Sequence, residues 1–388
     1  MRAPLSWLRE WVALPEDLSG AALGEILVRA GLEVERVEQP GHEITGPLVV
    51  GRILRFVDEP QKNGKTIRWV QVDVGPEHNQ PHPDFTDGCR EVVCGAHNFE
   101  VGDLVVVSLP GTTLAGGFEI ASRKTYGHVS DGMICAEDEL GIGHDHTGII
   151  VLPADAGLAP GNDPADVLHL RDEVLDIEVS PDMAYCMSIR GLAREAGQSL
   201  GVAFTDVVDK ATPASRADGY PVVLDDPACP LFVALTVTGV DATRRTPSWL
   251  QRRLTRAGMR SISLPVDISN YVMLETGQPL HAYDADTLRG PIRVRRAQPG
   301  ETLVTLDDVE RRLDATDLLI TDDSGPIGLA GVMGGASTEV RDTTSTIVIE
   351  AASFDAATIS RSMRRHGLPS EASKRFERRV DPNAAYSA

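Results

Sequence analysis

The chain has 388 residues, of which 42% are hydrophobic, so it is long enough for two or three domains with ordinary globular cores. Its 57 acidic and 37 basic side chains give a net charge of −20, which argues against non-specific polyanion binding because phosphate affinity comes largely from Lys and Arg. Five cysteines without a Cys-x-x-Cys pair argue against a disulfide framework or a zinc ribbon. No apolar run approaches the roughly 18 residues that span a bilayer, and the charged first residues do not form a secretory signal, so we expect a cytoplasmic protein.

Residues 1–38 are predicted to form two helices followed by a strand. Leu5, Leu8 and Val12 share one helical face. Ser19 is a candidate N-cap of the second helix, and Gly31 is a candidate stop. This segment carries no visible chemistry and is interpreted as scaffold.

The pattern then changes to short strands at close spacing between Leu48 and Leu152. Five strands are expected, and each ends in turn residues: 48–60, 65–75, 90–99, 103–111 and 148–153. Such a series is typical of a small β-barrel of the oligonucleotide-binding kind, in which nucleic acid lies across an open face. Small barrels serve many other functions, and the segment offers few aromatic stacking platforms if Phe85, Phe99 and Phe118 are core residues.

Three pairs in the same region invite a metal interpretation: His78 with His82, His144 with His146, and Cys89 with Cys94. None has the convergent spacing of a structural zinc site, so loop histidines and ordinary cysteines are the favoured explanation.

Residues 153–226 are interpreted as a connector between two halves. It opens with a turn-rich stretch, continues as a helix around Met183 to Ala196, and ends in a polar, proline-containing linker at 206–221.

The stretch Asp267 to Asp284 combines a helix, a glycine stop and a proline turn that presents His281. Asp267 is a plausible N-cap and Gly277 can end the helix. Pro279 prevents its continuation, which predicts a loop at His281. A loop after a rigid helix is a suitable place for a binding site, although the segment by itself is more typical of a solvent-exposed loop histidine.

Two segments are locally basic on this acidic chain. Residues 244–260 hold six arginines and no acid, and residues 361–379 hold seven basic and two acidic side chains. Arg252, Arg253 and Arg256 are expected on the polar face of a helix that begins near Pro247 and ends at Gly258. These patches fit a local nucleic-acid contact, but they fit solvated helix faces at least as well.

Four strands are predicted in the C-terminal part, and their patterns lie at 291–297, 301–308, 317–322 and 345–351. The glycine-rich segment 325–335 resembles a phosphate loop only superficially, since it lacks the Lys-Ser/Thr pair, and its glycines are interpreted as points of close backbone approach. Glu350 ends a very apolar strand, so if it points inward it needs a polar partner such as a ligand.

Helices are predicted after Asp355, ending at Gly367, and from Ser370 to Asp381, with Ala372, Phe376 and Val380 on one face of the second. Asp381-Pro382 then begins another helical pattern that has no room to form before Ala388, which suggests a truncated polypeptide.

Eight motifs, in order, resemble the β subunit of bacterial phenylalanyl-tRNA synthetase over the whole chain. They are WLREWV, GLEVERVE, CGAHNFEVGD, SDGMICAEDELGI, GQPLHAYD, GLAGVMGG, IEAASFD and RRHGLPSEASKRFERRVDP. The resemblance implies a multidomain α+β chain. It implies a split scaffold domain at 1–39 and 153–190, an inserted tRNA-binding domain of oligonucleotide-binding fold at 40–152, a linker at 191–209 and an editing domain at 210–388.

The same resemblance implies a function and partners. The β subunit pairs with an α subunit in an α2β2 ligase that uses ATP and magnesium, and α carries the aminoacylation site. This portion is expected to bind tRNA(Phe), to hydrolyse tyrosine misattached to it, and to hold neither ATP nor magnesium itself. The anticodon-binding domain near the C-terminus of family chains is absent from the sequence.

The resemblance also implies the editing residues. Glu350 reads the tyrosyl hydroxyl, and His281 and Asn270 are the expected catalytic residues that position water and the ester. The wall of the pocket is expected to contain Gly331, Gly334, Ser370 and Ala372. Ser269 and Ser370 stand where threonine is expected, which predicts a slightly larger pocket.

Two other functions remain open. One is a tRNA-binding or assembly module with an inactive pocket, which the joint presence of His281, Asn270 and Glu350 disfavours. The other is a free-standing hydrolase that acts in trans on mischarged tRNA, which the abrupt end of the chain disfavours.

Overall fold

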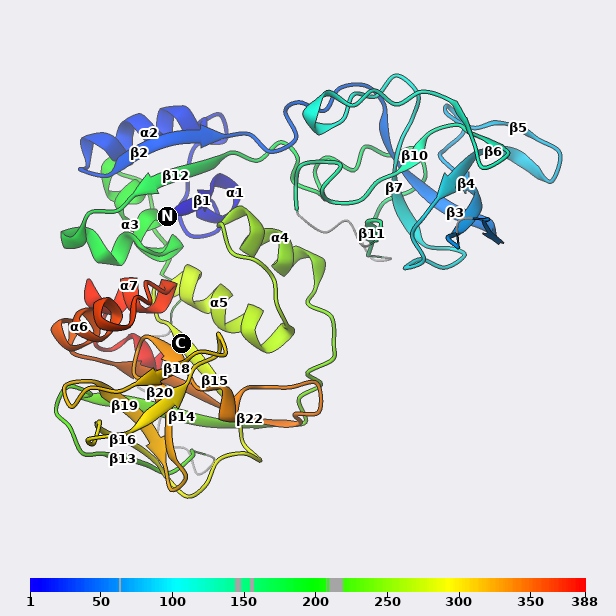
Figure 1. The fold of residues 1–388 in the computed structure, drawn as a ribbon. Helices are drawn as coiled ribbons and strands as arrows, with labels where there is room; N and C mark the ends of the chain where they lie inside the picture. The colour runs from blue at the N-terminus through cyan, green and yellow to red at the C-terminus, as the bar shows by residue number, and fades with distance from the viewer. Residues whose placement is uncertain (63, 144–147, 154–156, 207, 209–218) are drawn as a thin grey trace. The chain divides into compact units, whose positions relative to one another are not determined.

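A computed structural model describes residues 1–62, 64–143, 148–153, 157–206, 208 and 219–388. The chain forms two compact units, one of residues 1–37 with 174–388 and the other of residues 38–173 (Figure 1). Helices and strands occur in both sequence halves, so the predicted mixed class is confirmed.

The first unit begins with a three-stranded sheet of order β1-β12-β2, with bounds Arg2–Pro4, Val174–Glu178 and Glu33–Glu38. β12 follows the second unit in sequence yet pairs with β1, so segments from both sides of the second unit share one sheet. Helices α1 (Leu5–Leu8) and α2 (Gly20–Arg29) come between β1 and β2 in the chain. Ser19 caps α2 as predicted, because its side chain accepts a hydrogen bond from the Ala22 amide.

The predicted connector is more helical than its composition suggested. After the 3-10 helix η2 (Pro181–Cys186), α3 spans Ile189–Leu200, so the first ten residues of the expected linker 191–209 are helical. Ile189, Leu192, Ala193 and Ala196 are all buried on one face of α3, which is why the helix forms here. Of the polar stretch 206–221, residues 207 and 209–218 lie outside the described part of the chain.

The N-terminal core also takes in helices α4 (Ser248–Arg256) and α5 (Leu264–Thr276). Leu250 and Leu254 of α4 and Leu274 of α5 belong to the same buried cluster as Trp7 and Leu8. Segments expected in two different domains therefore share one hydrophobic core.

The prediction that the arginines of α4 form a solvated or nucleic-acid-binding surface is wrong. Arg252 and Arg256 are each only 6% exposed, and the Arg2 side chain donates to the carbonyl of Arg256. Arg253 forms an ion pair with Glu10 and donates to the hydroxyl of Tyr271. The helix packs its charged face inward because these partners come from residues 1–10 and from α5, which helical periodicity alone does not reveal.

The C-terminal part of this unit holds two larger sheets and a hairpin. The five-stranded sheet has the order β13-β16-β19-β20-β21, with bounds Val222–Leu224, Ile292–Arg296, Leu318–Asp322, Gly325–Leu329 and Met333–Gly334. The three-stranded sheet has the order β14-β22-β15, with bounds Leu231–Thr238, Thr346–Ser353 and Leu280–Asp284, and β17 (Thr302–Val304) pairs with β18 (Glu310–Arg312). All four predicted strands are present.

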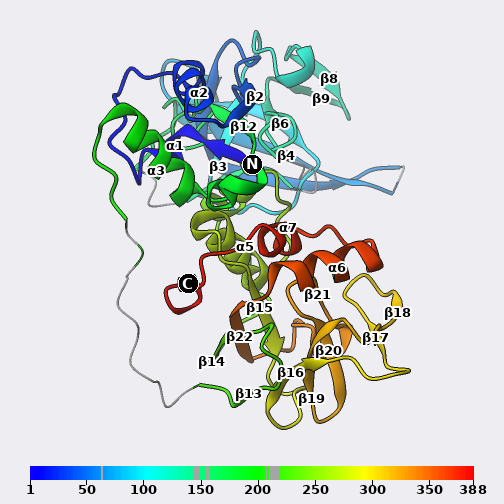
Figure 2. The same ribbon diagram turned by 90° about the vertical axis from the view of Figure 1, so that its left-hand side faces the viewer.

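Helices α6 (Ala356–His366) and α7 (Glu371–Glu377) run side by side at one end of these sheets (Figure 2). Asp355 caps α6 by accepting from the Thr358 amide, and Gly367 ends it with a φ of 64°, both as predicted. Ile359 and Phe376 carry the apolar faces of the two helices into the core of the sheets. A short 3-10 helix, η4, spans Ala384–Tyr386.

The second unit is dominated by a seven-stranded antiparallel sheet of order β10-β7-β3-β4-β6-β5, with β11 also paired to β7. In chain order, the bounds are β3 Leu48–Pro60, β4 Thr66–Asp73, β5 Gln80–His82, β6 Phe85–Cys94, β7 Leu104–Ser108, β10 Met133–Ile134 and β11 Val151–Leu152. All five expected strands are found. A separate hairpin joins β8 (Arg123–Thr125) to β9 (His128–Ser130).

One expected core residue of this unit is on the surface. Phe99 is 1% exposed, whereas Phe118 is 49% exposed. The Arg123 guanidinium lies 5.2 Å from the centre of the Phe118 ring. The sequence could not separate the two phenylalanines, because both lie in short segments without a clear period.

Candidate functional site

The pair of strands β15 and β22 places the two most strongly predicted site residues together. His281 stands directly opposite Glu350 in the antiparallel register. The expected loop at His281 is therefore wrong: α5 ends at Gly277, whose φ is 89°, and the chain enters a strand at Leu280. Gln278 is fully buried and donates to the carbonyls of Pro279 and Ala352, which holds this turn against β22.

Because alternate residues of a strand share a face, Tyr283 lies on the same side of β15 as His281. The ring centres of these two residues are 4.6 Å apart and the rings stand at 81°, edge to face. The hydroxyl of Tyr283 donates a hydrogen bond to Oε2 of Glu350. Tyr283 was not predicted from the sequence. A strand predicted at 280–284 would have identified it, because residues two apart on a strand point to the same side.

These side chains border a cavity of about 80 Å³. Since one molecule occupies about 30 Å³ in liquid water, this volume corresponds to about three water molecules. The cavity is lined by Pro279, Leu280, His281, Tyr283, Ile320, Gly328, Leu329, Gly331, Val332, Met333, Gly334, Glu350, Ala372 and Phe376. The expected wall residues Gly331, Gly334 and Ala372 are thus all present.

The glycine-rich segment forms β20, a turn and β21, and it allows close approach as predicted. A Cβ atom on Gly334 would lie 2.4 Å from Cε1 of His281. Gly331 has a φ of 66°, and a Cβ there would lie 2.9 Å from the ring of Phe376. Larger residues at either position would push on the side chains that line the cavity.

Burial sets the electrostatics of the cavity. It raises the pKa of Glu350 to about 7, while the hydrogen bond from Tyr283 acts in the opposite direction. Burial also lowers the pKa of His281 to about 4 and, together with the nearby Glu350 carboxylate, raises the pKa of Tyr283 well above its ordinary value. At neutral pH the histidine is therefore uncharged, and its buried Nε2 has no hydrogen-bond partner among the described residues.

Two predicted site residues do not line the cavity. Ser370 caps α7, and its hydroxyl donates to the carbonyl of Val332, so it fixes the glycine-rich segment from behind. Asn270 is half-buried on α5 and is not among the lining residues.

Helix α5 begins at Leu264, one turn earlier than predicted. Asp267 is not its N-cap, because the buried Asp267 carboxylate instead accepts hydrogen bonds from Thr246, Ser261 and the Ile262 amide.

Ser269, the other position at which threonine was expected, donates its hydroxyl to the carbonyls of Pro265 and Val266 within α5. Its side chain is therefore engaged by its own helix.

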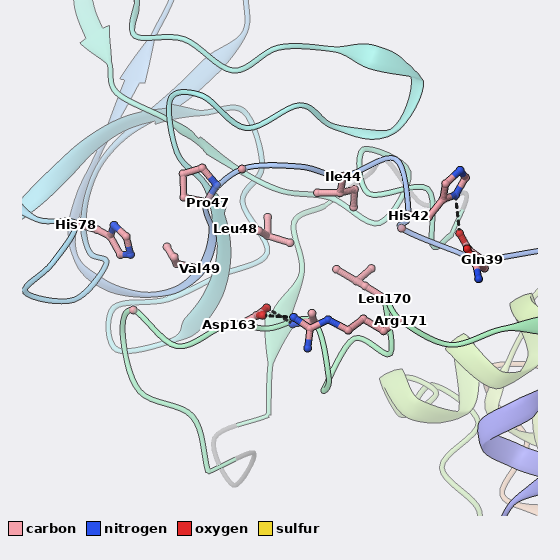
Figure 3. A pocket seen from close by; sticks show the side chains of 14 residues that line it. Gln39, His42, Ile44, Pro47, Leu48, Val49, His78, Asp163, Leu170 and Arg171 are labelled. Carbon is pink, nitrogen blue, oxygen red and sulfur yellow. Dashed lines mark hydrogen bonds and ion pairs between the residues drawn. The ribbon is translucent and has the colours of Figure 1, made fainter. Parts of the chain in front are cut away.

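A larger cavity of about 600 Å³ lies in the second unit, between the start of β3 and the segment that ends the unit (Figure 3). Several of its polar groups are already paired. Arg171 forms ion pairs with Asp163 and Asp166, and Nδ1 of His42 lies 2.9 Å from the carbonyl oxygen of Gln39. No predicted site residue lines this cavity.

Within the described residues no cluster of three or more His, Cys, Asp or Glu side chains could hold a metal ion. Cys89 and Cys94 are buried free thiols, and burial raises the pKa of both. His144 and His146 lie outside the described residues. The described residues also contain no helix long and apolar enough to cross a membrane.

Comparison with known families defines the class of the chain. Residues 48–161 match the family described as "Putative tRNA binding domain", and residues 228–388 match the family described as "B3/4 domain". The chain thus carries a putative tRNA-binding domain within its second unit, followed by a domain of the B3/4 type that contains the small cavity.

Comparison with whole proteins identifies the family. The chain is 54% identical over 389 residues to the "Phenylalanine--tRNA ligase beta subunit" of Thermobifida fusca (strain YX) and 56% identical over 393 residues to that of Streptomyces avermitilis. The protein of the same name from Cutibacterium acnes is 52% identical over 395 residues. The chain belongs to the family of phenylalanine–tRNA ligase beta subunits, which confirms the resemblance carried by the eight motifs.

These matches cover all of this chain but 46%, 46% and 47% of the three relatives, so the chain spans about half the length of the curated relatives it matches. A crystal structure of an N-terminal fragment of the phenylalanyl-tRNA synthetase beta subunit from Pyrococcus horikoshii aligns with a TM-score of 0.27 at 14% identity. That alignment covers 50% of this chain and 62% of the other, and its score is too low to support an argument about the fold.

Proposed function

We propose that this chain binds tRNA(Phe) and hydrolyses tyrosine misattached to it. The observation that carries the proposal is the pairing of Glu350 with His281 on adjacent strands, at a cavity whose other walls are largely apolar. The B3/4-type domain that holds this pair acts, in our proposal, as the editing domain. Asn270 does not line the cavity, so the proposal rests on His281 and Glu350.

The cavity suits discrimination between tyrosine and phenylalanine. An apolar pocket rejects an added hydroxyl only about a hundredfold, whereas a site that hydrogen-bonds the hydroxyl rejects its absence by about 10⁴ or more. Glu350 is 7% exposed and supplies the acceptor. Phenylalanine in the same position would leave this buried polar group without the bond, at a cost of about 1–3 kcal/mol or more for a charged group.

His281 acts in this proposal as an uncharged hydrogen-bonding group. A pKa of about 4 makes it a much weaker base than an ordinary histidine, whose pKa is about 6.5. Its unpartnered Nε2 is instead suited to hold the attacking water or the ester. An aminoacyl ester is already activated, so positioning of water contributes more than proton removal at this site.

The second unit supplies the tRNA contact. It matches the putative tRNA-binding family, and we propose that its antiparallel sheet is an oligonucleotide-binding barrel. Its exposed groups include Phe118, Arg123, Lys124 and Tyr126, which lie on and just before the β8–β9 hairpin. An aromatic ring with a guanidinium beside it is suited to stack bases and contact phosphate at once.

The wider assembly is part of the same proposal. In it the chain joins an α subunit in an α2β2 enzyme of the cytoplasm, and α carries the ATP- and magnesium-dependent aminoacylation. The name of the relatives, phenylalanine–tRNA ligase beta subunit, supports this arrangement. The residues of the present chain are proposed to bind neither ATP nor magnesium.

The test measures release of tyrosine from Tyr-tRNA(Phe) by the protein in its natural assembly. Wild type is expected to hydrolyse this ester and to spare Phe-tRNA(Phe), and Glu350→Ala is expected to lose the preference for tyrosine. His281→Ala is expected to lower the hydrolysis rate on both esters. Normal tRNA affinity without hydrolysis would favour the alternative, a tRNA-binding or assembly module with an inactive pocket.

A further inference from the structure

The two oxygen atoms of the Glu350 carboxylate have different surroundings. The Tyr283 hydroxyl donates to Oε2, and within the described residues no hydrogen bond reaches Oε1. Tyr283 is 1% exposed and its ring packs edge-on against the ring of His281, so the phenol is held from both sides. Glu350 itself lines the cavity. One oxygen is thus anchored, and the other remains for a ligand.

We propose that Tyr283 is a positioning residue for the hydrolysis proposed above: its hydroxyl holds Oε2 of Glu350 so that Oε1 accepts the hydroxyl of a tyrosyl ester. This inference rests on the proposed function. An anchored carboxylate loses little side-chain freedom when the ligand binds, which strengthens the contact. A carboxylate can accept at both oxygens, so the internal and the ligand hydroxyl do not compete for one site.

Tyr283 also favours the charged form of Glu350. The titratable groups that face this carboxylate are His281 and Tyr283 of β15 and Cys229 just before β14. All three are neutral at pH 7, since burial lowers the pKa of His281 to about 4 and raises those of Tyr283 and Cys229, the latter to about 12. The neighbouring α7 contributes Ala372 and Phe376, which carry no charge.

The substitution Tyr283→Phe removes this one donor and keeps the ring. The pKa of Glu350, already raised to about 7, is then expected to rise further, so that the carboxyl is protonated at neutral pH. A bond to an ionised acceptor is roughly twice as strong as one to a neutral acceptor. KM for Tyr-tRNA(Phe) is therefore expected to rise about tenfold at neutral pH, with kcat less affected, and the pH midpoint of kcat/KM is expected to move upward.

Tyr185→Phe is the matched control. Tyr185 also donates its hydroxyl to a carboxylate, Oε1 of Glu195 at 2.9 Å, but it is 44% exposed and does not line the cavity. This variant should keep the wild-type KM and pH midpoint. The double variant Tyr283→Phe with Glu350→Gln should match Glu350→Gln alone, because Tyr283 acts through Glu350. Thermal unfolding of each variant identifies those that fail to fold.

An unchanged KM and pH midpoint in a folded Tyr283→Phe protein would overturn the inference and leave the proposed function intact. The inference would also be overturned if the effects of Tyr283→Phe and Glu350→Gln on KM were additive in the double variant. If wild type hydrolyses neither ester, the proposed function fails separately. In that case, the binding of free L-tyrosine and L-phenylalanine is measured by calorimetry. The inference requires that Tyr283→Phe reduce the preference for tyrosine, and it fails if that preference is unchanged.

Discussion

Two cavities among the described residues differ in a way that volume does not reveal. The larger, of about 600 Å³, lies in the second unit, and its charged side chains are already paired with each other, as Arg171 is with Asp163. The smaller, of about 80 Å³, keeps a buried carboxyl and a buried imidazole at one wall, with a free Nε2 on His281. Unsatisfied or shifted polar groups, rather than volume, mark the cavity that is suited to chemistry.

The largest effect is expected from crowding the small cavity. Gly334→Ala places a methyl group about where the His281 ring now lies, since the added Cβ would be 2.4 Å from Cε1. Displacement of a reacting group by about 1 Å can cost about a hundredfold in rate, so hydrolysis of Tyr-tRNA(Phe) should fall by at least that factor. The matched variant Gly328→Ala meets its nearest atoms at 3.7 Å and should lose less than tenfold. Equal losses in the two variants would argue against the proposed position of His281.

The second effect concerns stability. The pKa of Glu350 is about 7 in the folded protein and near its ordinary 4.5 when unfolded, so the folded state binds the proton more tightly. Stability from this group is full below pH 4.5 and is lost as pH rises towards 7, by up to about 3 kcal/mol. Glu350→Gln should therefore gain stability relative to wild type as pH rises through this window. Chemical denaturation at several pH values measures the difference, and a gap that does not change with pH would contradict the burial of an ionisable Glu350.

A moderate effect is expected on the surface of the second unit. Lys124→Glu replaces an exposed positive charge on the β8–β9 hairpin with a negative one and should weaken tRNA affinity about fivefold to tenfold at low salt. Arg312→Glu reverses an exposed charge on β18 and serves as the control. Filter binding at two or more salt concentrations tests both variants, and equal weakening would mean that the hairpin is not a contact.

The smallest effect is expected in the large cavity. Arg171→Ala removes ion pairs whose arginine side chain is 66% exposed, and such pairs contribute about 0–1 kcal/mol. Unfolding free energy should change by less than about 1 kcal/mol, and hydrolysis of Tyr-tRNA(Phe) should not change. A large loss of hydrolysis would show that the contrast between the two cavities is mistaken.

The sequence predicted elements well where local signals were strong. The capping side chains of Ser19 and Asp355, the αL stop at Gly277 and the alternating or apolar strands were all readable, because each depends on a few neighbouring residues. The family motifs brought together His281, Glu350, Gly331, Gly334 and Ala372, which periodicity alone would have left scattered.

The remaining features depend on contacts between distant segments. His281 was expected in a loop because Pro279 ends the helix, yet β22 lies beside the next residues and pairs with them. The arginines of α4 were expected on the surface because their partners, among them Glu10 and Tyr271, are remote in sequence. Tyr283 became visible only once this strand pairing fixed which side chains share a face.

The bond between Gln39 and Glu173 has a consequence for how the chain folds. These residues stand at the two ends of the second unit, and Nε2 of Gln39 donates to Oε1 of Glu173 at 3.1 Å. For a flexible loop of roughly 135 residues, bringing the ends together would cost about 4 kcal/mol of chain entropy. When the second unit folds by itself, its ends are already adjacent, so β2 and β12 can meet as though a short turn connected them. Exchange of the whole unit for a brief turn would then be expected to leave the three-stranded sheet able to form.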